Sequence, residues 1–218
     1  MDNKNINTIT LVLALVAGYC DTVTFVAARN IFSAHVTGNF IVFAYQLVTG
    51  ASMDAWIKLI TFPIFIMAVM SGGWLAKNQG QKKTLLAEAL LLLTAGILAF
   101  ILHLDNQDTV VMYAVVLLVV FAMGMQNALG KVFSKATHGP TTMMTGNVTQ
   151  ASLDLRAILI GENTAEAVAS LKKQSVTIFG FLGGCFLGGL LGKEYGLAAV
   201  ALSGLCMIAC YALSKKQD

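Results

Sequence analysis

Apolar residues occur along the chain in six continuous runs, each about as long as a membrane-crossing helix. The runs cover about residues 7–28, 55–76, 84–103, 109–129, 174–192 and 195–213. A helix needs roughly 20 apolar residues to cross about 30 Å of hydrocarbon, and each run approaches this length. The runs do not alternate between apolar and polar residues, which argues against a β-barrel. The pattern therefore predicts an all-α integral membrane protein.

Two shorter helices are predicted between these runs, and each begins at a copy of one tripeptide. The copies are Thr37-Gly38-Asn39 and Thr145-Gly146-Asn147. The first precedes the apolar run 40–48, about half a membrane long, and the second opens a helix to about residue 160 that is too polar to lie in lipid. The repetition of a polar loop and a helix start indicates two related halves.

The two halves match residue by residue, which predicts an internal repeat within a single membrane domain, 1–218. Gly18 and Asp21 match Gly124 and Asn127 at a separation of 106 residues, and the tripeptides match at 108. At a separation of 116, the matched sets are Thr61, Phe65, Gly72, Gly73 and Lys77 with Thr177, Phe181, Gly188, Gly189 and Lys193. We place repeat 1 at about 7–103 and repeat 2 at about 109–213.

The distribution of lysine and arginine indicates how the repeats are oriented. If both short helices cross the membrane, each half has four spans, the repeats are parallel and the 14 cationic residues divide 7 to 7. If neither crosses, each half has three spans, the repeats are inverted and the division is 11 to 3, which fits the positive-inside rule. Letting only the first short helix cross also gives 11 to 3. Repeat symmetry favours two inverted repeats of three transmembrane helices, each with a short re-entrant or broken helix, and both termini in the cytoplasm.

Composition supports a membrane protein and excludes several classes of function. Hydrophobic residues make up 57% of the chain and charged residues 11%, with a mean hydropathy of +0.75, whereas soluble domains are about 25% charged. The net charge of +3 is spread over many loops, and nucleic-acid binding would need a concentrated basic face. The cysteines and histidines lack metal-ligand spacing, and no nucleophile arrangement or nucleotide loop is present. We expect no metal, cofactor, nucleic-acid partner or catalysis.

The tripeptides have the composition of a helix start suited to face a solute. Thr and Asn are good N-cap residues, Gly allows a backbone or ligand to approach, and the free amides with the helix dipole give a positive end. In inverted-repeat transporters, broken helices point such ends at substrate near the midplane. The predicted substrate-binding residues are therefore Thr37, Gly38, Asn39, Thr145, Gly146 and Asn147. Alternatively, each tripeptide only caps a helix and packs against its counterpart.

Asp21 lies within the first apolar run, where a carboxylate is costly unless it faces protein or water. Its repeat partner is the neutral Asn127, so a two-fold site would carry one titratable carboxylate. Asp21 is predicted to couple transport to protons, and the alternative is a structural partner for Arg29 or for a backbone amide. Gln126 and Asn127 are predicted to line the same cavity, or else to join helices by hydrogen bonds.

A ladder of glycines at a spacing of four residues is formed by Gly180, Gly184, Gly188 and Gly192. Small residues at this spacing are typical of close packing between membrane helices. The partner helix belongs either to the other half of the same chain or to a second copy, in a homodimer through this face.

Three motifs, taken in order, give nearly the whole chain a resemblance to a known family. They are Gly18-Tyr19-x-Asp21, Phe32-Ser33-x-His35-x-Thr37-Gly38-Asn39 and Pro140-Thr141-x-Met143-Met144-Thr145-Gly146-Asn147-Val148-Thr149. With these motifs the chain resembles the YoaK-like family of bacterial integral membrane proteins. The resemblance implies a small multi-pass protein of the bacterial cytoplasmic (inner) membrane, classified as a domain of unknown function. It supplies no substrate and no catalytic residue.

Taken together, these patterns favour a small secondary transporter or channel for a small polar or anionic metabolite, embedded in the lipid bilayer. The alternative is a non-transporting membrane protein, an assembly or sensing partner whose polar residues only hold helices together. An intramembrane enzyme acting on lipid has little support. A transporter predicts a polar cavity joining Asp21 to both asparagines, whereas a structural protein predicts these groups bonded to one another in a dry core.

Overall fold

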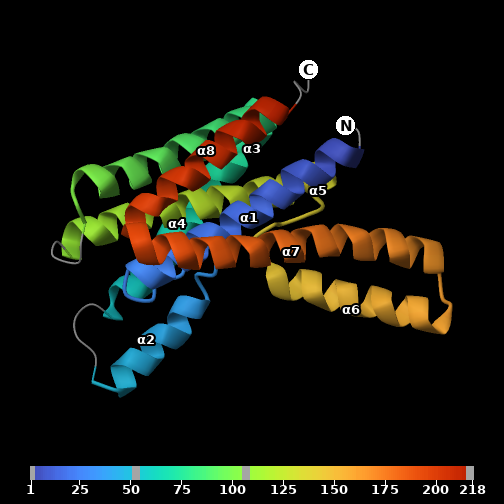
Figure 1. Cartoon of the computed structure of the whole chain (residues 1–218), viewed down its shortest axis with the longest axis horizontal. Coiled ribbons are helices and arrows are strands. Elements are labelled where there is room, and N and C mark those ends of the chain that lie inside the picture. Colours follow the sequence, from blue (N-terminus) through green and yellow to red (C-terminus); the bar gives the residue numbers. More distant parts are fainter. Residues whose placement is uncertain (1–2, 51–54, 105–108, 215–218) are drawn as a thin grey trace.

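The computed structural model describes residues 3–50, 55–104 and 109–214, and this part of the chain is helical without a strand. The helices are α1 (Asn3–Ala27), α2 (Gly38–Val48), α3 (Ile57–Ile101), α4 (Thr109–Val132), α5 (Ser134–Thr137), α6 (Met144–Ile160), α7 (Thr164–Tyr195) and α8 (Val200–Leu213), with a 3-10 turn, η2 (Gly196–Ala199), before α8. Figure 1 shows α2 and α6 along one side of the bundle made by the longer helices. The predicted all-α fold is confirmed.

Four stretches of helix are long and apolar enough to cross a membrane. They are Asn5–Ala27, Ile57–Ile101, Thr109–Val132 and Thr164–Leu213, the last interrupted by η2. Large apolar side chains remain exposed on their outer surfaces, among them Met70, Trp74 and Phe186. Such a surface is expected where the surrounding solvent is lipid. These features indicate a membrane-embedded protein.

The longest helix, α3, consists of two arms joined at Gly80. This residue has φ 82° and ψ 173°. The conformation is not helical, and its positive φ favours glycine. In the first arm Gly72 packs against Met125 near the end of α4, whereas the second arm ends at Ile101, shortly before α4 begins. The arms therefore run in opposite directions. The sequence places a polar connection between the apolar runs 55–76 and 84–103. In the structure both arms stay helical up to Gly80, and the chain reverses at this one residue, whose backbone conformation suits glycine.

The directions of the packed helices follow from which residues meet. The glycine ladder packs along α1, with Gly180 at Leu11 and Gly192 at Val23, so α1 and α7 run in the same direction. The second arm of α3 and α8 run in opposite directions, because Lys82 Nζ lies 5.4 Å from the ring centroid of Tyr211 while Gly96, further along α3, meets Ala201, nearer the start of α8.

The glycine ladder is occupied within the chain. A Cβ on Gly184 would meet the carbonyl of Leu15, and one on Gly188 would meet the backbone of Tyr19. Within the described chain, the helix that packs against the ladder is therefore α1, which belongs to the other half. A homodimer through these four glycines has no free face, because α1 already covers them.

Glycine contacts between the halves occur in matched pairs. Each pair consists of two contacts. The glycine and its neighbour in one contact are the repeat counterparts of the glycine and its neighbour in the other, and each residue's counterpart lies in the opposite half. The pairs are Gly18 with Phe181 and Gly124 with Phe65; Gly188 with Tyr19 and Gly72 with Met125; and Gly96 with Ala201 and Gly204 with Leu93. The third pair matches at a separation of 108 residues, as the tripeptides do. The first two pairs show that the interface of α1 with α7 corresponds to the interface of α4 with the first arm of α3. Both contacts of the third pair lie in the single interface of α8 with the second arm of α3.

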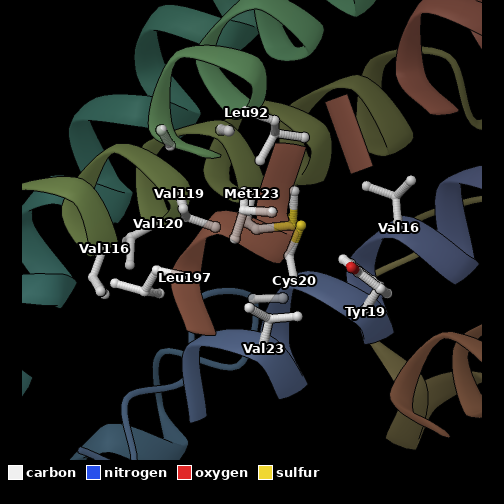
Figure 2. Close-up of a cluster of buried hydrophobic side chains, with 14 of the residues drawn as sticks. Val16, Tyr19, Cys20, Val23, Leu92, Val116, Val119, Val120, Met123 and Leu197 are labelled. Atoms are coloured by element: carbon white, nitrogen blue, oxygen red, sulfur yellow. The ribbon is translucent and has the colours of Figure 1, made fainter. Parts of the chain in front are cut away.

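The apolar core lies where α1, the second arm of α3, α4 and η2 meet. Figure 2 shows Cys20 of α1 close to Leu92 of α3 and Met123 of α4. The one polar atom of Tyr19 is satisfied there, since its hydroxyl donates to the carbonyl of Ala199 at 2.9 Å. This packing fixes α1, and with it the position of the neighbouring Asp21.

Candidate functional site

The carboxylate of Asp21 organises the loop between α1 and α2. Asp21 is 4% exposed, and its Oδ1 accepts hydrogen bonds from the backbone N–H groups of Ala34 at 2.7 Å and His35 at 3.2 Å. Its Oδ2 lies 2.7 Å from Nδ1 of the same histidine. Of the expected structural partners, backbone amides are present, whereas Arg29 donates to Thr109 Oγ1 at 3.3 Å. One carboxylate therefore holds the middle of the loop against α1.

His35 is the residue that this arrangement presents to the other half of the protein. Its hydrogen bond to Asp21 raises the pKa of His35 above the ordinary value, and burial opposes this effect only in part. Its ring stands edge-on to the ring of Phe181, with centroids 5.3 Å apart. The imidazole is thus held in a fixed orientation, and its pairing with a carboxylate favours the positively charged form.

Asn39, in the first tripeptide, is bonded entirely within the protein. Its Oδ1 accepts the N–H of Phe32 at 2.8 Å, and its Nδ2 donates to the carbonyl of Phe32 at 2.8 Å and to Thr61 Oγ1 at 3.0 Å. The side chain is 0% exposed. Both amide donors are used, so Asn39 closes its own loop and ties α2 to α3.

Asn147 has the same place in the second tripeptide but not the same bonds. The residue seven positions earlier is Pro140, where the first loop has Phe32. Proline has no N–H, so the bond that closes the first loop cannot be repeated. The Nδ2 of Asn147 is buried without a hydrogen-bond partner. Two identical tripeptides therefore have different surroundings.

Both short helices begin at the tripeptides as predicted, but neither threonine acts as a side-chain cap. Thr37 is the N-cap residue of α2 with helical φ −69° and ψ −25°, and its side chain makes no capping bond. A side-chain cap needs a non-helical residue at that position. In α6 the N-cap residue is Met143, so Thr145 lies inside the first turn.

The two adjacent residues predicted on α4, Gln126 and Asn127, have different surroundings and different roles. Gln126 is fully buried, and its Nε2 donates to the carbonyl of Leu13 at 2.7 Å and to Thr141 Oγ1 at 2.8 Å. It therefore joins α4 to α1 and to the loop before α6. Asn127 donates to Thr142 Oγ1 at 2.7 Å and lines a cavity.

This cavity, of about 390 Å³, lies where the two loops meet. Its walls are Ala34, His35, Val36 and Thr37 from the first loop, Thr142, Met143, Met144, Thr145 and Gly146 from the second, Phe65 of α3 and Asn127 of α4. Residues 34–37 and 142–145 are counterparts at the 108-residue separation of the tripeptides. From their starts, α2 and α6 diverge at a wide angle, α2 to the lower left and α6 to the right in Figure 1. The cavity thus lies between matching segments of the two halves.

The walls match in backbone but differ in chemistry. The counterparts of Asp21 and His35 are Asn127 and Met143. One wall therefore has an imidazole paired with the carboxylate of Asp21 behind it, and the other has an amide and a thioether. Thr37, Thr142 and Thr145 also line the cavity, and the rest of its wall is apolar. A protonated histidine with neutral donors suits a small anionic or polar solute.

Four of the eight predicted binding residues line the cavity, namely Thr37, Asn127, Thr145 and Gly146. The other four, Gly38, Asn39, Gln126 and Asn147, are not in its wall. His35 and Thr142 were missed as lining residues. The signal for His35 was its position two residues before the tripeptide, in a loop that had to return toward Asp21. Among the described residues, no group of three or more His, Cys, Asp or Glu side chains is placed to hold a metal ion.

Comparison with known proteins places the chain in an uncharacterised group. A family model with the description "Protein of unknown function (DUF1275)" matches residues 9–213. Neither the curated proteins nor the solved structures contain a match. Function has therefore to be argued from the site.

Proposed function

We propose that this chain, which belongs to the DUF1275 family over residues 9–213, is a small secondary transporter or channel for a small polar or anionic metabolite. The observation that carries the proposal is the cavity between residues 34–37 and 142–145. In transporters built from inverted repeats, substrate binds near the bilayer midplane at the ends of broken helices. His35 would supply positive charge, and Asn127, Thr37 and Thr145 would supply hydrogen bonds.

The proposal includes two inverted repeats, and the matched glycine pairs support it. The second arm of α3 and α8 are the third spans of the two repeats, and they run in opposite directions. Parallel repeats of four spans would give them the same direction. Contacts exchanged between counterparts, such as Gly96 with Ala201 and Gly204 with Leu93, are what a two-fold axis in the membrane plane would produce.

The direction of α1 supports two partial helices. If only α2 crossed the membrane, α1 and α7 would have to run in opposite directions, but the glycine ladder aligns them in the same direction. Both termini would then lie in the cytoplasm of a bacterial cell, with 11 of the 14 cationic residues on that side. Lys215 and Lys216, which belong to these 11, lie outside the described residues.

Alternating access requires the cavity to open to each side of the membrane in turn. The two short helices diverge from their starts beside the cavity, α2 to the lower left and α6 to the right in Figure 1. They are the elements we propose as gates, α2 toward the outside and α6 toward the cytoplasm.

The second candidate is a non-transporting assembly or sensing protein. Its support is the set of polar groups bonded within the protein, above all Asn39 with Phe32 and Gln126 with Leu13. These groups match a dry, helix-joining role. The cavity does not reach Asp21, Asn39 or Asn147. It has His35 and Asn127 in its wall, and these two side chains are what favour transport over this candidate.

Solute binding and uptake test the proposal. Purified protein is heated with a panel of small carboxylates, phosphates and neutral polar metabolites, and solutes that raise its melting temperature are tested for uptake into proteoliposomes. Loss of one neutral hydrogen bond, about 1 kcal/mol, predicts roughly fivefold weaker binding to Asn127→Ala or Thr145→Val. Ser152→Ala is the control, since Ser152 lies outside the cavity wall and its hydroxyl only bonds the carbonyl of Val148. Equal binding by all three variants would contradict the site, and absence of uptake would contradict transport.

A further inference from the structure

Glu88 is an acidic side chain buried in the second arm of α3 without a partner. It is 0% exposed, and neither carboxyl oxygen has a hydrogen-bond partner. The ion pairs of the described residues do not include it. It lies in a helix apolar enough to cross a membrane. Burying an unpaired carboxylate in such surroundings is strongly unfavourable, whereas the neutral acid avoids most of this desolvation cost.

The titratable groups around Glu88 are thiols, which are poor partners for a charge. Cys20 of α1 and Cys210 of α8 interact with it electrostatically, and Cys206 of α8 interacts with both of these thiols. Among the described residues, no lysine, arginine or histidine forms an ion pair with Glu88. Alkali and alkaline-earth cations prefer several oxygen ligands, which thiols do not supply. The surroundings of Glu88 therefore suit a proton better than a metal ion.

Buried polar side chains lead to Glu88 from the Gly80 end of the helix. Gln81 is 5% exposed and Thr84 is 0% exposed, and both lie on the same face of α3 as Glu88. The Nε2 of Gln81 also has no hydrogen-bond partner. With a rise of about 1.5 Å per residue, Gln81 lies roughly 10 Å from Glu88 along the helix. Gln81 and Thr84 are therefore polar groups placed between Glu88 and the Gly80 end of this arm.

We infer that Glu88 is a proton-binding site in the membrane interior that exchanges with water along Gln81 and Thr84. Binding forms an O–H bond at one carboxyl oxygen, release returns the proton to water at the Gly80 end, and no electron is transferred. Its use in coupling rests on the proposed transport function. There Glu88 takes the place first expected for Asp21. The carboxylate of Asp21 is already bonded to the backbone of Ala34 and to the backbone and ring of His35, whereas neither carboxyl oxygen of Glu88 has a partner.

Infrared spectroscopy of the protein in lipid membranes, titrated from acid to alkaline pH, tests the site directly. Wild type is expected to keep a carboxylic acid C=O band above neutral pH, and Glu88→Gln is expected to lose it. Glu166→Gln, at the exposed start of α7, should keep the band. A band that disappears at the pH of ordinary exposed carboxyls, or that survives Glu88→Gln, would overturn the inference.

Two further measurements test the inference. The melting temperature of Glu88→Gln shows whether this substitution disturbs the fold, and a pH jump on Gln81→Leu shows whether protons pass along Gln81. Glutamine matches the neutral acid in shape and charge, so Glu88→Gln should melt at the wild-type temperature. A large loss would mean that Glu88 is charged and paired, which overturns the inference. After a pH jump, Gln81→Leu should slow the response of the band at least several-fold, and an unchanged rate would exclude exchange along Gln81.

Proteoliposome uptake separates this inference from the proposed function. If the Glu88 band behaves as expected but no solute is bound or taken up, the proton site stands and transport fails. If solute is taken up but the band is absent, transport stands and the proton site fails. If both hold, uptake by Glu88→Gln should no longer respond to a pH gradient, whereas the surface variant Glu166→Gln should still respond.

Discussion

Oδ2 of Asp21, inside α1, lies 2.7 Å from Nδ1 of His35 in the following loop. The contact joins the buried interior of one helix to the wall of the cavity between the two halves. The corresponding residues of the second half, Asn127 and Met143, cannot form an ion pair. A cavity with two matching walls therefore has one ionisable side.

Replacing Asp21 by asparagine should destabilise the first loop. The amide would present N–H groups toward the N–H donors of Ala34 and His35, which now point at a carboxylate. Hydrogen bonds to a charged group contribute about 1.5–3 kcal/mol, so a loss of this order in unfolding free energy is expected. Thermal or denaturant unfolding in detergent measures it, with Glu166→Gln as the surface control. An Asp21→Asn variant as stable as this control would contradict the role of Asp21.

The ion pair should also make stability depend on pH. Because Asp21 raises the pKa of His35 in the folded state, protonation favours folding. The contribution is present below the ordinary histidine pKa of 6.5 and is lost as the pH rises through the raised value. The difference in melting temperature between wild type and His35→Gln should therefore be largest in acid and shrink toward alkaline pH. If the difference in melting temperature instead grew as the pH rose, the pair of Asp21 and His35 would not stabilise the folded state through protonated His35.

The two asparagines of the tripeptides should respond differently to alanine. Asn39→Ala removes three hydrogen bonds and leaves the buried groups of Phe32 unpaired, at about 1–3 kcal/mol for each orphaned group. Asn147→Ala removes an amide whose nitrogen has no partner, so it should cost little. Unfolding measurements on the two variants form a matched pair, and equal losses would argue against the different bonding of the two loops.

Neighbouring glycines in α7 give a matched test of helix packing. A Cβ on Gly184 would meet the carbonyl of Leu15, whereas a Cβ on Gly183 would meet nothing within 4 Å. Overpacking typically costs about 1–3 kcal/mol, so Gly184→Ala should be destabilised by this amount. Gly183→Ala should be unaffected or slightly stabilised. Melting temperatures compare them, and the reverse order would exclude the contact between α1 and α7.

Cysteine reporters test the orientation of the repeats. Thr49, at the end of α2, and Gln79, beside the Gly80 reversal, are both exposed. The inverted topology predicts that Thr49→Cys reacts with a membrane-impermeant maleimide added outside intact cells, and that Gln79→Cys reacts only after the membrane is opened. Wild type measures the background from its four native cysteines. Labelling of both reporters from one side would exclude this topology.

Local patterns predicted much of the fold because they depend only on neighbouring residues. The apolar runs located the long helices, and the start of α2 and the bounds of α6 lie within one residue of those expected. The matched glycines were visible for two of the three interface pairs. The third pair, Gly96 with Gly204, lies in leucine- and alanine-rich segments, where one glycine is a weak signal. Glu88 could have been noticed by the reasoning applied to Asp21, since both are carboxylates inside apolar runs.

By itself the sequence determined an all-helical protein with long apolar helices and two short helices that begin at a repeated tripeptide, because periodicity and length act locally. The two related halves stay a prediction from the sequence. The tertiary structure decided which polar groups meet. Asn39 and Asn147 have identical neighbours in the tripeptide, but a residue seven positions earlier, Phe32 or Pro140, determines whether the loop can close on the amide. Asp21 meets His35, and α1 covers the glycine ladder, because contacts between distant segments depend on how helices pack, which no local pattern records.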